Sequence, residues 1–123
     1  MAEEIKYKLD FVSVGLVARL DWKQDPKVNE EFKFLVSFSD TQEDLADNEF
    51  VDPGHVVEVS LWMPNCGPNG GHPSAPVTIK EVSPGVYEVS KAYFVMTGRW
   101  DVVLSLKKND KLVDFAIQKL TIK

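Results

Sequence analysis

The stretch that decides the fold is VEVSLWM, residues 57–63. Every second residue from Val57 to Met63 is apolar, and the residues between them are polar except Trp62. Alternation of apolar and polar residues is typical of a β-strand with one buried face. The stretch therefore predicts a strand that ends with Met63 on the core side and Trp62 turned outward.

The same period of two recurs along the chain, with turn residues between the runs at roughly 10–14-residue spacing. We expect an all-β fold, an Ig-like antiparallel β-sandwich of about seven to nine strands. A single Cys allows no disulfide within the chain. The further strands are expected around these apolar sets: Ile5 to Phe11, Leu16 to Trp22, Phe32 to Phe38, Val77 to Ile79, Val86 to Phe94, Trp100 to Leu106 and Val113 to Ile122.

Two of these runs give more specific predictions. Trp100 shares its parity with the apolar residues that follow it, so we expect it to be the core tryptophan. In the last run, Phe115 and Ile117 lie on one parity, whereas the apolar residues from Leu120 onward lie on the other. This switch predicts a β-bulge near residues 118–119.

Size and charge limit the class of protein. At 123 residues, we expect one β-sandwich domain covering residues 1–123. The net charge of −5 argues against nucleic acid and anionic membranes as partners. No apolar run approaches the ~18 residues that a membrane-spanning helix needs, so we expect no membrane insertion by this segment.

An acid-rich segment, residues 40–52, separates two of the expected strands. Its first part, Thr41 to Ala46, predicts one short helical turn with Asp40 as N-cap and Glu43 in a capping box. The acids lack the spacing of an EF-hand calcium loop. We therefore expect a solvated surface connection without bound calcium.

A loop rich in Gly, Pro and Asn follows the deciding strand and carries chemically special residues. Met63 ends the strand, Cys66 is the only thiol, and His72 is one of two imidazoles. Soft sulfur ligands with imidazole suit Cu(I) and, to a lesser degree, Zn, and the loop glycines allow the backbone to fold back. The alternative is that Met63 is a core residue, Cys66 a small loop residue and His72 an exposed one.

Two further residues bear on this candidate metal site. Met96 is a fourth candidate ligand, provided that its turn lies beside the Gly/Pro loop; otherwise it is core filler. His55 begins the strand that ends at Met63, and nine residues of strand span ~30 Å. We therefore expect His55 to be a surface residue at the opposite end of the sandwich.

The sequence carries no pattern that predicts an enzyme. A nucleophilic Cys66 would need a base, which His72 could supply, and a third group to orient that base. No Asn or Asp spacing marks such a group, and no helix N-terminus lies nearby to lower the pKa of the thiol. We expect a protein that is not an enzyme.

Several runs together resemble the FixH-like and YtkA-like families of small extracytoplasmic β-sandwich domains. They are LWMP at residues 61–64, the loop to His72, PVTI at 76–79, GVY at 85–87 and FVMTGRW at 94–100. These families share a Met-Pro-x-Met-x-His-like turn followed by Gly-x-Tyr and Met-x-Gly-x-Trp. Here Cys66 replaces the second Met of the turn, and His72 follows an insertion. The resemblance covers about His55 to Lys107.

The resemblance implies a copper-handling domain, periplasmic or otherwise extracytoplasmic, whose export signal or anchor is absent from this sequence. Its Cu(I) ligands would be Met63, Cys66, His72 and Met96, and it would deliver Cu(I) or aid cytochrome oxidase assembly, with a protein partner in the cell envelope. The alternative is a non-catalytic Ig-like interaction or accessory module without metal. The two differ in whether the four side chains converge.

Overall fold

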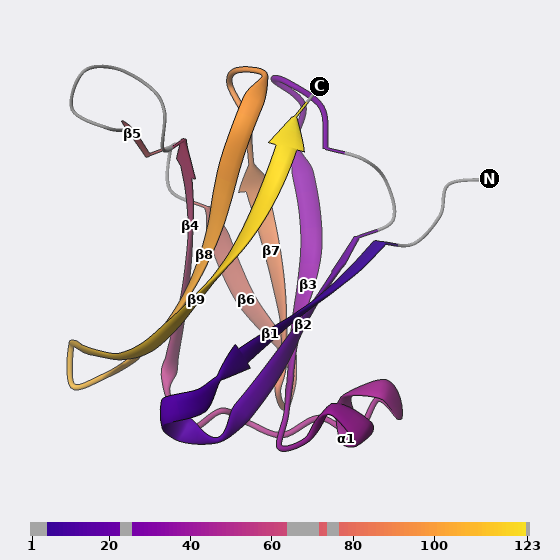
Figure 1. Ribbon diagram of the computed structural model, residues 1–123, viewed down its shortest axis with the longest axis vertical. Helices are drawn as coiled ribbons and strands as arrows, with labels where there is room; N and C mark the ends of the chain where they lie inside the picture. The colour runs from indigo at the N-terminus through magenta and orange to yellow at the C-terminus, as the bar shows by residue number, and fades with distance from the viewer. Residues whose placement is uncertain (1–4, 23–25, 64–71, 74–76, 123) are drawn as a thin grey trace.

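The computed structural model describes residues 5–22, 26–63, 72–73 and 77–122 (Figure 1). Within them the chain forms nine strands, one short α-helix and one 3-10 turn. In chain order these are β1 (Ile5–Phe11), η1 (Val12–Val14), β2 (Leu16–Trp22), β3 (Phe32–Ser39), α1 (Gln42–Ala46), β4 (Val56–Met63), β5 (His72–Pro73), β6 (Thr78–Ser83), β7 (Val86–Ala92), β8 (Gly98–Lys108) and β9 (Lys111–Ile122).

The strands form two antiparallel sheets. One has the order β1-β2-β3-β7-β6 and the other the order β5-β4-β8-β9. Figure 1 shows the strands running along the long axis, with the ends of β4 and β9 near the top and α1 at the bottom. The prediction of an all-β antiparallel sandwich is confirmed.

The inner faces of the two sheets meet in one apolar core, as the alternation predicts. Trp100 is fully buried, and its ring packs edge-on against Phe94 at 5.3 Å between centroids. Aromatic side chains of β2 and β3 continue this core, with Trp22 and Phe32 5.1 Å apart. Edge-to-face packing at these distances adds to the stabilisation from burial. The expected core tryptophan is therefore confirmed.

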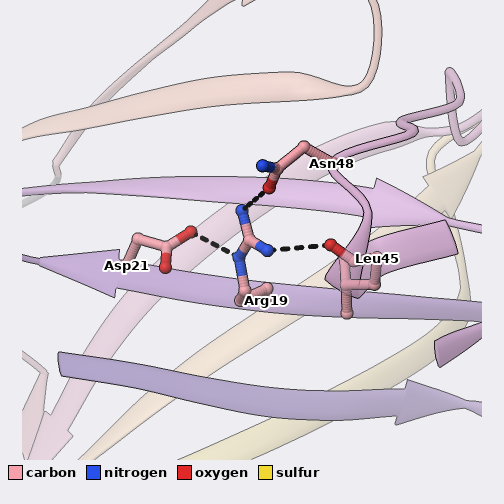
Figure 2. Close-up of polar contacts among 4 residues, drawn as sticks. All are labelled: Arg19, Asp21, Leu45 and Asn48. Atoms are coloured by element: carbon pink, nitrogen blue, oxygen red, sulfur yellow. Dashed lines mark hydrogen bonds and ion pairs between the residues drawn. The ribbon is translucent and has the colours of Figure 1, made fainter. Parts of the chain in front are cut away.

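A buried ion pair lies on the other face of β2, where the alternation predicts exposed residues (Figure 2). Arg19 Nε contacts an Asp21 carboxylate oxygen at 2.7 Å. The other guanidinium nitrogens donate to the carbonyl oxygen of Leu45 at 2.8 Å and to Asn48 Oδ1 at 2.9 Å. Leu45 is itself fully buried. Arg19 thus anchors α1 and the residues after it to the sheet.

These contacts refine the prediction for residues 40–52. Most of the acidic side chains there are exposed, and the predicted helical turn is present as α1. The predicted cap is wrong, because Thr41, not Asp40, is the N-cap. The Thr41 hydroxyl accepts the N–H of Asp44 at 3.0 Å, an N-cap arrangement that satisfies one unpaired donor of the first turn.

The predicted bulge in the last strand is also misplaced. The pairing of β8 with β9 is regular from Gly98 to Leu106, and the register shifts only between Leu106 and Lys107. Phe115 and Ile117 therefore face outward and are 51% and 41% exposed. The apolar parity in β9 changed because the strand has apolar residues on both faces, so it did not mark a bulge near residue 118.

Candidate metal site at the end of the sandwich

Met63 is the last residue of β4 and lies at the rim of the core. It is 8% exposed, as its parity predicts, while Trp62 is 37% exposed on the other face. β4 is held between two neighbours, since Trp62 pairs with Asp101 of β8 and Met63 pairs with His72 of β5. Directly opposed residues of an antiparallel pair have Cα atoms ~4.5–5.5 Å apart. The backbone of His72 therefore runs beside Met63.

Gly98, the first residue of β8, provides space for Met63. A Cβ atom added to Gly98 would lie 3.1 Å from the terminal methyl carbon of Met63. Gly98 also has φ +122°, a backbone conformation that L side chains rarely adopt. The thioether of Met63 thus packs against backbone that a side chain would otherwise cover.

Met96 lies two residues before Gly98, in the connection between β7 and β8. The connection is attached to the core through Phe94, which is fully buried and whose carbonyl oxygen accepts the N–H of Asn29 at 2.9 Å. Met96 itself is 48% exposed. The interpretation of Met96 as core filler is therefore wrong.

The structure brings three of the segments that carry expected ligands to one end of the sandwich. Met63, the strand that contains His72 and the segment that contains Met96 meet at one end of the sandwich. Cys66 lies outside the described residues, and for His72 the backbone alone is described. His55 directly precedes β4 at its other end, where its Nδ1 lies 2.7 Å from the carbonyl oxygen of Pro53. Its predicted separation from Met63 is confirmed.

Two described residues at this end, Met63 and Met96, carry sulfur. Within residues 5–22, 26–63, 72–73 and 77–122, no three His, Cys, Asp or Glu side chains gather as a metal site. The described donors are the thioethers of Met63 and Met96, which are soft and suit Cu(I) better than Zn or Ca. The donor set at this end therefore fits Cu(I).

Sequence reasoning missed the roles of Gly98 and of the Trp100 N–H. The Trp100 indole nitrogen donates to the carbonyl oxygen of Met96 at 3.0 Å. The Met-x-Gly-x-Trp spacing of Met96, Gly98 and Trp100 carries part of the family resemblance, but the motif does not say what Gly98 and the indole N–H contact. What gives the spacing its meaning is the approach of Met63, which comes from a different strand.

Comparison with known protein families agrees with this architecture. The sequence model of the YtkA-like family matches residues 16–105, so the chain belongs to the YtkA-like family. Members of this family are in general extracytoplasmic domains. The match begins in β2, so the family likeness extends well before His55, where the resemblance in the motifs begins. The likeness to the FixH-like family rests on the sequence motifs alone.

Neither curated proteins nor solved structures gave a match to the chain. None of the helices in the described part of the chain has the length and apolar character needed to cross a membrane.

Proposed function

We propose that this protein is a copper-handling domain that binds Cu(I) with Met63, Cys66, His72 and Met96. The observation that carries the proposal is the approach of the Met63 methyl group to Gly98, two residues from Met96. Two thioether-bearing segments from different parts of the chain therefore share one end of the sandwich. Thioethers favour Cu(I) over harder cations.

The loop between Met63 and His72 would complete the site. Its two ends lie on neighbouring backbones, because Met63 pairs with His72. Cys66 lies within that closed loop, three residues after Met63. A thiolate and an imidazole added to two thioethers would give one S₃N set, and binding of Cu(I) to the thiol would release a proton.

Binding and delivery, not catalysis, is the role that we propose. The domain would act in the periplasm or elsewhere outside the cytoplasm and pass Cu(I) to a protein partner in the cell envelope, such as a cytochrome oxidase under assembly. Membership of the YtkA-like family supports the location. The half-exposed Met96 supports delivery, since an acceptor could reach this ligand from solvent.

The proposal is tested by titrating the purified protein with Cu(I) against a competing chelator. We expect one Cu(I) per chain. Cys66→Ser should weaken binding most, since a thiolate is lost, and Met63→Leu and Met96→Leu should weaken it less while preserving the fold. His55→Ala is the control and should leave affinity unchanged, because His55 lies at the other end of β4. Equal binding by wild type and Cys66→Ser would contradict the proposed ligand set.

The second candidate is a metal-free interaction module, and exposed apolar side chains at the same end favour it. Trp62, Tyr93 and Val95 are 37%, 38% and 44% exposed. Exposed aromatic side chains such as Trp62 and Tyr93 are a residue type enriched at protein contacts. A wild-type protein that binds no Cu(I) would favour this candidate over the first.

A further inference from the structure

Trp100 links the buried core to the segment that carries Met96. Its side chain is fully buried and packs against Phe94, so the position of the indole ring is fixed from inside the sandwich. Its N–H nevertheless reaches the carbonyl oxygen of Met96, four residues earlier in the chain, at 3.0 Å. A core side chain therefore holds the backbone of a half-exposed residue.

Few other described contacts hold this segment. The carbonyl oxygen of Phe94 accepts a hydrogen bond from the N–H of Asn29, but Val95 and Met96 are both more than two-fifths exposed. Gly98 then allows a backbone conformation with φ +122° and leaves room for the Met63 methyl group. The Trp100 hydrogen bond fixes the chain between Phe94 and Gly98, at the half-exposed residue Met96.

We propose that Trp100 is a positioning residue for Met96. Its indole N–H fixes the Met96 backbone two residues before Gly98, which the Met63 methyl group approaches, so that the Met96 segment is already ordered at this end of the sandwich before Cu(I) arrives. The inference rests on the proposed copper function. Ligands that are already in place lose less conformational freedom on binding, and the affinity is correspondingly higher. Trp100 itself need not touch the ion.

The chain offers a matched control in Trp22. It is also a core tryptophan, 2% exposed, but its indole nitrogen finds no hydrogen-bond partner among the described residues. Removing an indole N–H at either position changes core packing in a similar way. Removing it at position 100 alone breaks a bond to the Met96 segment.

The sharpest replacement is β-(3-benzothienyl)alanine, which keeps the bicyclic ring but has sulfur in place of the N–H. It is introduced at position 100 in one protein and at position 22 in another; Trp100→Phe and Trp22→Phe form a second pair. Each protein is titrated with Cu(I) against a competing chelator, and amide hydrogen exchange is followed at residues 96–98. Circular dichroism establishes that each variant is folded under the conditions of the titration.

We expect the change at position 100 to weaken Cu(I) binding up to about tenfold, because binding must then order a segment that one hydrogen bond of about 1.4 kcal/mol holds in wild type, and to speed exchange at residues 96–98. The change at position 22 should leave the Cu(I) affinity and the exchange rates at residues 96–98 within about twofold of wild type. Unchanged affinity in a folded position-100 variant would overturn the positioning role alone. A wild type that binds no Cu(I) would overturn the proposed function and, with it, this role.

Discussion

The guanidinium of Arg19 and the carboxylate of Asp21 meet at 2.7 Å on the outer face of β2, where their side chains are only 10% and 9% exposed. The ring of Phe50 lies 5.5 Å from the guanidinium carbon. Burial removes both charges from water, so each becomes dependent on the other. One Asp21 oxygen, Oδ1, has no hydrogen-bond partner among the described residues, so the pair with Arg19 is its carboxylate's main compensation.

Asp21→Ala should therefore lower the free energy of unfolding by about 3–5 kcal/mol, because it leaves a buried guanidinium without its counter-charge. Urea denaturation followed by fluorescence measures the change. Glu31→Ala is the control: it breaks the exposed pair of Glu31 with Lys33, 3.7 Å apart, and should cost no more than about 1 kcal/mol. Equal costs for the two variants would contradict a structural role of the buried pair.

Gly85 should tolerate no side chain. It has φ +80°, and an added Cβ would lie 2.3 Å from the carbonyl oxygen of Val51. Gly85→Ala should cost about 2–5 kcal/mol, the sum of ~1–2 for the left-handed conformation and ~1–3 for the overlap. Gly15→Ala is the matched control, since Gly15 has φ +68° but no atom within 4 Å of the added Cβ. Gly15→Ala should show only the cost of the left-handed conformation. If both variants lose the same free energy of unfolding, the overlap at Gly85 contributes nothing.

The pH dependence of stability should carry a contribution from Tyr87. Burial, a hydrogen bond to Glu81 and the charges of Glu81 and Asp52 raise the pKa of Tyr87 well above its ordinary value of 10.0. The folded state then holds the phenolic proton more tightly than the unfolded state. The stabilisation is complete below pH 10 and is lost as the pH rises from there toward the folded-state pKa.

Tyr87→Phe removes this contribution. We expect the free energy of unfolding of wild type to fall more steeply between pH 9 and about pH 11 than that of Tyr87→Phe. Urea denaturation at a series of pH values gives both slopes. Parallel slopes would show that Tyr87 titrates alike in the folded and unfolded states.

Calcium should leave the protein unaffected, because the acids of residues 40–52 lack the spacing of a calcium loop. Addition of millimolar Ca²⁺ should not change the Tm in differential scanning calorimetry, and Mg²⁺ at equal ionic strength controls for screening. A rise of several degrees with Ca²⁺ alone would reveal binding to the native state.

The sequence by itself determined which residues face the core. Phe34, Val36 and Leu61 are buried as their alternation predicts, because the side chains of a strand point to opposite faces in turn. The hairpin between β8 and β9 is also local in origin, since Asn109 and Asp110 both have positive φ, as a type I′ turn requires. These properties depend on residues close together in the chain.

The alternation stopped being informative where both faces of a strand are apolar or covered. In β9, Phe115 and Ile117 resembled core residues but face outward, because only pairing with β8 sets the parity. In β2, Arg19 and Asp21 resembled surface residues but are buried under α1 and the chain that follows it. Neither outcome can be read from one strand alone.

Only the tertiary structure decided how the end of the sandwich is assembled. The sequence identified Met63 and Met96 as residues of interest, but three strands, β5, β6 and β7, lie between them in the chain. The pairing of β4 with β8 brings the Met63 methyl group to Gly98, and the buried Trp100 fixes the backbone of Met96. Contacts between distant segments arise from the packing of whole sheets, which no local pattern of residues specifies.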